Sequence, residues 1–177
     1  LCTNGPDDRL NSTVISQPAI FVVSLAAARC IEEAKPGALE GMGTAGLSLG
    51  EYTSLVFAGC MDFEAAIEIV VRRGQYMQEA CDKVKSSMTS LLGLELPAVQ
   101  EIVAKASSEG IVAVSNVNSA KQIVISGEIP ALERAAELAK EAGARKAIPL
   151  KDAGAYHSPL MASATEKLLP LLEKVEI

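Results

Sequence analysis

The chain has 177 residues, of which 49% are hydrophobic and 21% charged, a composition that suits a folded globular domain and argues against a disordered or fibrous chain. Its net charge of −6 argues against the basic stripe that neutralises nucleic acid phosphates, so we expect no nucleic acid partner. Nothing in the composition points to a membrane partner.

The first residues are polar and acidic, without the pattern of a signal or transit peptide. Because the first residue is not methionine, the sequence suggests a chain that starts within a longer protein.

The dipeptide Gln17-Pro18 precedes an apolar run over 19–31, and proline suits the first turn of a helix. We therefore predict a buried helix that starts at Pro18.

A glycine-rich stretch at 41–46 has weak strand propensity, and a helical run to Ala58 follows it. The turn and the helix are well indicated, whereas the strand is not.

Asp62 is placed to cap the next helix, which has one apolar face and continues to about Cys81. Gly74 inside this helix suggests close packing against a crossing helix or a site that needs room.

From Met88 onward the pattern changes to short alternating segments. A polar turn at 118–121 separates two of the predicted strands. The predicted elements are strands at 88–92, 111–117, 122–126 and 146–150, and helices at 97–107 and 130–142. This β-α-β-β-α-β order is that of a split βαβ or ferredoxin-like unit. Ser158-Pro159 then predicts the start of a last helix.

The pentapeptide Gly46-Leu47-Ser48-Leu49-Gly50 is a G-x-S-x-G motif before a helical run. Glycines on both sides allow a sharp turn that exposes a serine, and the helix start directs N–H groups toward developing negative charge. Ser48 is thus a candidate nucleophile, although ordinary tight turns also carry this pattern.

A serine nucleophile needs a base, and the chain contains a single histidine, His157. It lies in a loop directly before the last helix, where a side chain can project into a cleft. A surface or packed histidine is the other interpretation.

Arg73 lies within an otherwise apolar helix face, and its guanidinium can hold a carboxylate with two parallel hydrogen bonds. The alternative is a solvated arginine beside Arg72.

Four ordered blocks that span nearly the whole chain resemble the malonyl-CoA:acyl carrier protein transacylases of type II fatty acid synthesis. The blocks are GLSLGEY at 46–52, VRRGQYMQEA at 71–80, NVNS at 116–119 with QIVISG at 122–127, and GAYHSPLM at 154–161. The resemblance implies an α/β fold, with an α/β-hydrolase-like large subdomain over 1–84 and 151–177 and an inserted ferredoxin-like subdomain over 85–150.

The resemblance also implies the role of each site residue. Ser48 would carry the acyl group, His157 would act as general base and acid, and Arg73 would bind the malonyl carboxylate. The backbone N–H of Leu49 would supply half of the oxyanion hole. Met77 and Asn118 fall on motif positions near the acyl pocket. The Ala155-Tyr156-His157 run is close to the Ala-Phe-His pattern that accompanies malonyl rather than methylmalonyl.

Two departures from the family pattern stand out. Leu47 occupies the place where many members have histidine before the nucleophile. The N-terminal Gly-Gln-Gly segment and the C-terminal glutamine segment of the family are absent, so the sequence is interpreted as an internal fragment whose own activity stays open.

Three other functions remain open. An acyltransferase domain of a polyketide or multifunctional fatty acid synthase would share the same serine, arginine and histidine. A serine hydrolase would usually add an acidic residue behind the histidine. A non-catalytic module would bind carrier protein without acylation of the serine.

The expected partners are malonyl-CoA and acyl carrier protein, with no cofactor and no metal, and we expect a cytoplasmic monomer. A plastid stroma or mitochondrial matrix is the alternative location.

The four cysteines form no C-x-x-C pair, so we expect buried, reduced thiols. They are Cys2, Cys30, Cys60 and Cys81.

Overall fold

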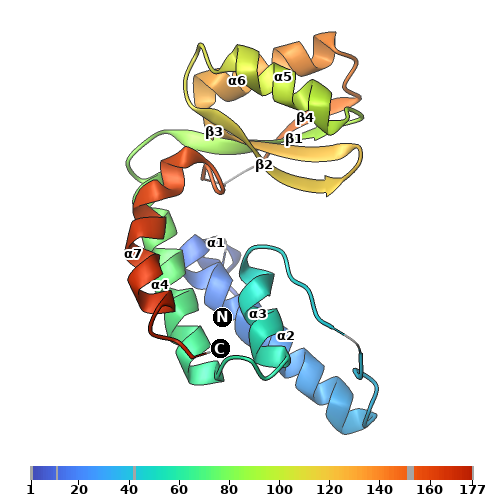
Figure 1. Ribbon diagram of the computed structural model, residues 1–177, viewed down its shortest axis with the longest axis vertical. Helices are drawn as coiled ribbons and strands as arrows, with labels where there is room; N and C mark the ends of the chain where they lie inside the picture. Colours follow the sequence, from blue (N-terminus) through green and yellow to red (C-terminus); the bar gives the residue numbers. More distant parts are fainter. Residues whose placement is uncertain (1, 11, 42, 151–153, 177) are drawn as a thin grey trace. The chain divides into compact units, whose positions relative to one another are not determined.

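The computed structural model describes residues 2–10, 12–41, 43–150 and 154–176, which form two compact units (Figure 1). The helical unit consists of Leu1–Tyr76 with Glu166–Ile177, and the sheet unit consists of Met77–Thr165. Each unit has its own hydrophobic core. The start of the predicted return segment, 151–153, lies outside the described residues.

The helical unit is built from five helices, two of which continue into the sheet unit. They are α1 (Asp7–Leu10), α2 (Thr13–Ala34), α3 (Leu49–Phe57), α4 (Phe63–Cys81) and α7 (Ala162–Leu172). The predicted helix after Asp62 is confirmed, and the Asp62 carbonyl accepts from the Ala66 amide over 3.0 Å. Phe21 and Phe63 stack with ring centroids 5.6 Å apart, so α2 and α4 share one core.

Helix α2 begins at Thr13 rather than at the predicted Pro18, which lies inside it. The Ser16 amide donates to the Ser12 carbonyl over 2.7 Å, so the first turn forms before the proline. Proline inside a helix removes one backbone hydrogen bond. Tertiary contacts hold this first turn, because Thr13 and Gln17 are both buried.

The prediction that α2 is buried is wrong for the described residues. Its buried residues are Thr13, Gln17 and Phe21, which recur every four positions and mark one side of the helix. Ile20 and Val23 are 56% and 48% exposed. A helix that is apolar all round needs neighbours all round, and the described helices cover one side. By length and composition alone α2 could cross a membrane, but core helices of folded proteins and signal sequences meet the same two criteria.

The cysteines also differ from expectation. All four are free, but Cys2, Cys30 and Cys60 are exposed and Cys81 is partly buried. Cys30 lies on the uncovered part of α2, and Cys60 lies in the turn between α3 and α4. A thiol joins a core only where neighbouring elements cover it, which sequence spacing does not reveal.

Gly74 allows α4 to approach the first turn of α2 very closely. A Cβ atom at this position would lie 2.9 Å from the Thr13 carbonyl oxygen and 3.2 Å from the Val14 Cα. The expectation of close packing against a crossing helix is confirmed.

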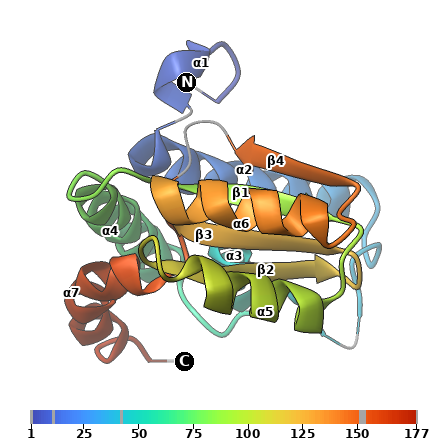
Figure 2. The same ribbon diagram turned by 90° about the horizontal axis from the view of Figure 1, so that it is seen from above.

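The sheet unit contains the six predicted elements in the predicted order. They are β1 (Ser86–Leu92), α5 (Leu96–Ala106), β2 (Val112–Ser119), β3 (Gln122–Glu128), α6 (Ile129–Glu141) and β4 (Lys146–Leu150). The four strands form one antiparallel sheet in the order β2-β3-β1-β4. Both helices cover the same face of this sheet (Figure 2). Their apolar sides and that face enclose the core, which includes Leu91, Ile123 and Ile125.

The predicted turn at 118–121 is shorter in the structure. Strand β2 continues to Ser119, which pairs with Gln122, so only Ala120 and Lys121 form the turn. The pairing of β2 with β3 shifts register between Val114 and Asn116 and again between Val117 and Ser119, as it does where a β-bulge adds one residue to a strand.

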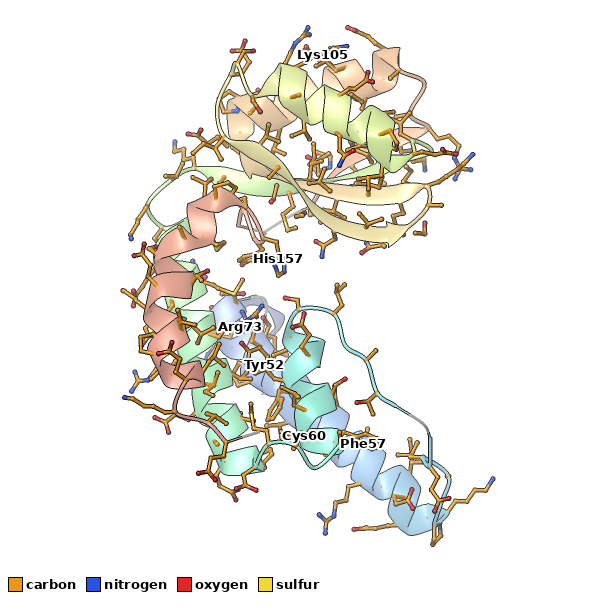
Figure 3. The ribbon with its side chains drawn as sticks, viewed as in Figure 1. Tyr52, Phe57, Cys60, Arg73, Lys105 and His157 are labelled. Atoms are coloured by element: carbon orange, nitrogen blue, oxygen red, sulfur yellow. The ribbon has the colours of Figure 1, made fainter. Side chains whose placement is uncertain are left out.

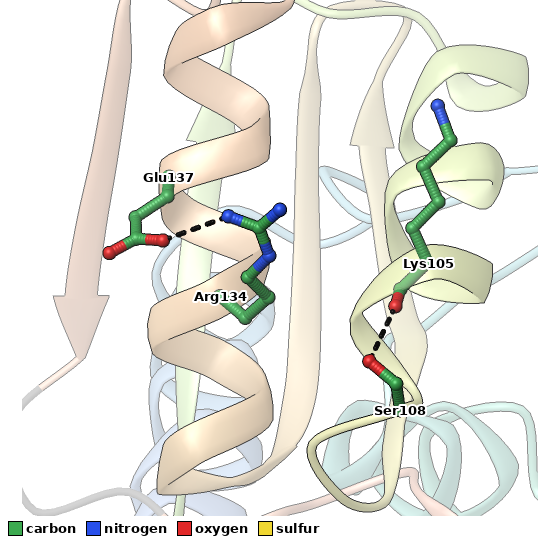
Figure 4. Close-up of polar contacts among 4 residues, drawn as sticks. All are labelled: Lys105, Ser108, Arg134 and Glu137. Carbon is green, nitrogen blue, oxygen red and sulfur yellow. Dashed lines mark hydrogen bonds and ion pairs between the residues drawn. The ribbon is translucent and has the colours of Figure 1, made fainter.

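Surface contacts on α5 and α6 are local. Arg134 and Glu137 form an exposed ion pair of 3.0 Å on α6, and Ser108 Oγ donates to the Lys105 carbonyl over 3.1 Å after α5 (Figure 4). Exposed pairs of this kind contribute about 0.2–1 kcal/mol. The sheet unit is therefore stabilised mainly by its core.

Gly74→Ala should destabilise the chain by about 1–3 kcal/mol, because the added methyl overpacks the crossing with α2. This is the net effect, after the roughly 1 kcal/mol by which alanine stabilises a helix interior relative to glycine. Gly50→Ala is the matched control, because a Cβ atom there meets no atom within 4 Å. Urea unfolding of both variants checks the prediction, and equal stabilities would contradict it.

Candidate functional site

Ser48 lies in a strained turn that leads directly into α3. Its backbone has φ 54° and ψ −105°, and a positive φ costs a non-glycine residue about 1–3 kcal/mol. The Gly50 amide donates to the Leu47 carbonyl over 2.9 Å, and the Glu51 amide donates to the Ser48 carbonyl over 3.2 Å. The predicted turn and helix are therefore confirmed, with Ser48 as the residue before the helix.

The glycine-rich segment before Ser48 forms no strand at residues 43–46. A strand needs a neighbouring strand for its hydrogen bonds, and the described part of the helical unit contains none. Met42, within the same stretch, lies outside the described residues. Gly46 is required by the turn, because a Cβ atom there would lie 2.0 Å from the Gly50 carbonyl carbon.

Leu49 is the first residue of α3 and is 8% exposed. Its side chain packs in the helical-unit core with Phe21 and Val70, which anchors the start of the helix. The first amides of a helix have no carbonyl partner within it. The backbone N–H of Leu49 therefore has no carbonyl partner within the helix, which is the property that the oxyanion role implied by the resemblance requires.

Arg73 is buried, with 8% exposure, and points toward Ser48. Its Nη2 donates to Ser48 Oγ over 2.8 Å, and its Nη1 donates to Gln17 Oε1. Arg72, in contrast, is exposed and donates to Gln75 over 3.3 Å. Of the two arginines, Arg72 is the solvated one, and Arg73 brings a guanidinium to the candidate nucleophile.

Tyr52 forms one wall around this guanidinium. Its ring centroid lies 5.7 Å from Arg73 Cζ, and the two side chains are drawn close together in Figure 3. Burial lowers the pKa of Arg73, and the nearby Tyr52 and Glu51 oppose that change. Burial raises the pKa of Tyr52, against the effect of the Arg73 charge. An arginine keeps its proton at any physiological pH, so a buried positive charge lies beside Ser48.

His157 lies in the sheet unit, in the loop before α7 (Figure 3). Its φ is 59°, and Ser48 and His157 are the two non-glycine residues with positive φ in the described part of the chain. Its side chain is exposed. Non-glycine residues in this region of φ often belong to functional sites. Both predicted catalytic residues have this property.

The residues around His157 hold its loop in one shape. Ser158 Oγ donates to the Ala155 carbonyl over 2.6 Å and accepts from the Leu160 amide over 3.2 Å, so the predicted cap is confirmed. Gly154 packs against Cys81, where a Cβ atom would lie 1.9 Å from the sulfur. The helix begins as a short 3₁₀ turn, Pro159–Met161, which continues into α7.

Met77 and Asn118 are the two remaining predicted site residues. Met77 is buried on α4, four residues after Arg73 and hence on the same side of that helix. Asn118 is exposed near the end of β2, in a strand rather than in the predicted turn. Both belong to the sheet unit, as His157 does, whereas Ser48, Leu49 and Arg73 belong to the helical unit.

The sequence reasoning missed the polar residues that contact Arg73. Gln17 is a buried amide in an apolar helix, and Tyr52 lies one helical turn after Ser48. A buried amide must find a polar partner, so the position of Gln17 among apolar residues could have indicated a polar contact in the sequence.

Among the described residues no three His, Cys, Asp or Glu side chains gather in a way that could hold a metal ion.

Comparisons with known proteins agree over almost the whole chain. Residues 1–176 match the family model described as acyl transferase domain. The malonyl CoA-acyl carrier protein transacylase of Bacillus subtilis (strain 168) is 40% identical over 178 residues, which cover 100% of this chain and 55% of that protein. The chain thus spans about half the length of the curated relatives that it matches.

Solved structures give the same result. The malonyl CoA-acyl carrier protein transacylase of Coxiella burnetii has a TM-score of 0.93 and 38% identity, covering 98% of this chain and 54% of that one. A structure of a type II polyketide acyl carrier protein in complex with its malonyl-transacylase has a TM-score of 0.91 and 39% identity. That match covers 98% of this chain and 55% of that one.

Gly46→Ala should destabilise the chain by about 3 kcal/mol, because the new methyl would overlap the Gly50 carbonyl and force the turn open. Gly43→Ala serves as the control, since a Cβ atom there meets no atom within 4 Å. Its effect should stay within about 0.5 kcal/mol. Urea unfolding measures both, and a Gly46→Ala variant as stable as the control would show that the turn tolerates a side chain.

Gly154→Ala should destabilise the His157 loop, and Cys81→Ala in the same chain should restore part of the loss. Removing the sulfur relieves the 1.9 Å overlap, while the Cys81 Cβ at 3.0 Å remains. A double-mutant cycle should give a coupling of about 1–3 kcal/mol. Cys60→Ala, which removes an exposed thiol, should give no recovery. Equal recovery from either cysteine change would refute the proposed packing.

Proposed function

This chain belongs to the acyl transferase domain family, and we propose that it transfers a malonyl group from malonyl-CoA to the phosphopantetheine thiol of acyl carrier protein. The transfer passes through a malonyl ester on Ser48. The observation that carries the proposal is the 2.8 Å hydrogen bond from buried Arg73 to Ser48 Oγ. A fixed positive charge beside a nucleophile suits an acyl group that ends in a carboxylate.

In the first half-reaction, Ser48 Oγ attacks the thioester carbonyl of malonyl-CoA while His157 takes its proton. The tetrahedral oxyanion accepts from the Leu49 amide. The C–S bond then breaks, and His157 returns the proton to the departing CoA thiolate. The carrier-protein thiol repeats these steps on the malonyl ester, which releases Ser48 as a hydroxyl. One thioester and one thiol are consumed and one of each is formed, so the transfer requires no cofactor.

Arg73 gives the transfer its substrate preference. The malonyl carboxylate replaces Ser48 Oγ as acceptor for the guanidinium once Oγ has become an ester oxygen. An acetyl group would leave the buried charge facing a methyl group, and a buried charge without a partner is costly. In this proposal the path of the acyl group is lined by Met77, which lies four residues further along α4, and by Asn118 on β2.

The finer architecture is also part of the proposal. In this proposal residues 1–84 and 151–177 belong to an α/β-hydrolase-like subdomain, of which the described part is helical, and 85–150 form a ferredoxin-like insert. The β-α-β-β-α-β order and the antiparallel sheet support the insert.

We place the protein in the cytoplasm as a monomer, with an organelle matrix as the alternative. An acceptor from fatty acid synthesis is proposed ahead of a polyketide carrier protein, and transfer assays with both carriers separate the two.

The test is the intact mass of the chain after brief exposure to malonyl-CoA or acetyl-CoA. We expect a malonyl adduct that Ser48→Ala abolishes, and little acetyl adduct. Arg73→Met should reduce the malonyl-over-acetyl preference by roughly 30-fold or more, the equivalent of about 2 kcal/mol. Arg72→Met is the matched control, because Arg72 is the exposed neighbour.

The same measurement is made on a chimera in which this chain replaces the matching segment of the Bacillus subtilis relative, so that the relative's flanking segments are present. A malonyl adduct that survives Ser48→Ala would exclude Ser48 as the acyl carrier. The absence of any adduct on both proteins would reject the proposed transfer.

A further inference from the structure

Gln17 is a buried amide in the apolar helix α2, and it contacts the Arg73 guanidinium. Its side chain is 6% exposed, and its Oε1 accepts from Arg73 Nη1. The two residues are 56 positions apart in sequence, so the contact depends on the crossing of α2 and α4. Gly74, the next residue of α4, permits that crossing.

Thr13 fixes which end of the Gln17 amide faces the arginine. Gln17 Nε2 donates to Thr13 Oγ1 over 3.3 Å, one turn earlier in the same helix. The amide oxygen is thereby directed to the guanidinium, which has only donors and needs an acceptor. An amide turned the other way would set donors against donors. Thr13 is itself buried, at 8% exposure, so water has little access to this pair.

The contacts of Arg73 define the plane of its guanidinium. Nη1 donates to Gln17 and Nη2 donates to Ser48 over 2.8 Å, while the centroid of the Tyr52 ring lies 5.7 Å from Cζ. A single contact would let the group rotate, whereas two contacts on different nitrogens hold it. The guanidinium has five N–H donors, so a held group still has donors to offer a carboxylate.

The anchor is neutral, which leaves the charge of Arg73 for the substrate. Arg73 belongs to neither of the ion pairs Arg29–Glu33 and Arg134–Glu137. A carboxylate at position 17 would hold the guanidinium equally well but would neutralise it. Glutamine therefore provides orientation without competing with an acyl carboxylate.

We propose that Gln17, oriented by Thr13, is a positioning residue that sets the preference for carboxylate-bearing acyl groups by holding Arg73 beside Ser48. This inference rests on the proposed function, in which Arg73 binds the malonyl carboxylate. Gln17 acts through Arg73, so its removal should change which acyl group is chosen more than whether Ser48 can be acylated.

The experiment compares malonyl and acetyl transfer to Ser48 by intact mass, using the full chain and the Bacillus subtilis chimera described above. Gln17→Met keeps the length of the side chain but removes the acceptor, and should lower the malonyl-over-acetyl ratio by roughly tenfold. Gln17→Glu should lower the ratio further, because its carboxylate occupies the guanidinium. In Gln17→Met the malonyl rate should fall more than the acetyl rate, and in Gln17→Glu the acetyl rate should rise, because a neutralised guanidinium no longer disfavours an acetyl group.

Three controls make the result specific. Gln75→Met removes an amide that accepts from exposed Arg72, and should leave the ratio unchanged. Thr13→Val should lower the ratio, and Thr13→Ser, which keeps the hydroxyl, should restore it. Urea unfolding of every variant separates a change of preference from a loss of folding.

The outcomes distinguish this inference from the proposed function. If Arg73→Met leaves the ratio unchanged, the role of Arg73 as carboxylate partner fails, and the role of Gln17 fails with it. If Arg73→Met abolishes the preference while Gln17→Met and Gln17→Glu keep it, only the positioning role is overturned. A Gln17→Glu variant that prefers malonyl as strongly as the original would also refute the argument from charge.

Discussion

Arg73 donates to Gln17 on α2 and to Ser48 at the start of α3, and it does so from within α4. A buried guanidinium must satisfy its donors inside the protein, so this one charge requires three helices to meet at fixed positions. The core around Phe21 and Leu49 supplies the apolar attraction, but it is not directional. The hydrogen bonds of Arg73 add the direction that apolar packing lacks.

Glycines make these close approaches possible. Gly46 lets the chain turn at Ser48, Gly74 brings α4 against α2, and Gly154 brings the His157 loop against Cys81. In each case a methyl group would lie within 3 Å of a neighbouring atom. The three glycines have no chemical role of their own, yet each determines where a candidate catalytic or binding side chain is held.

The local elements of the fold were predictable from the sequence, because they depend on short-range patterns. The alternation from Met88 onward and the G-x-S-x-G turn identified the sheet unit and the start of α3 correctly. The start of α2 and the exposure of its apolar residues were not predictable, since both depend on which elements pack against the helix. The same limit applies to the cysteines. Among site residues, motif positions pointed to Ser48 and Arg73, but the contact from Gln17 required knowledge of a helix crossing.

Under the proposed function, the positive φ at Ser48 and His157 sets activity against stability. Each residue holds its backbone in a conformation that glycine would adopt at lower cost, by about 1–3 kcal/mol. Under the proposed function, glycine at either position would relax the backbone but remove a side chain that the transfer uses. The proposed transfer thus accounts for two side chains that occupy unfavourable backbone positions.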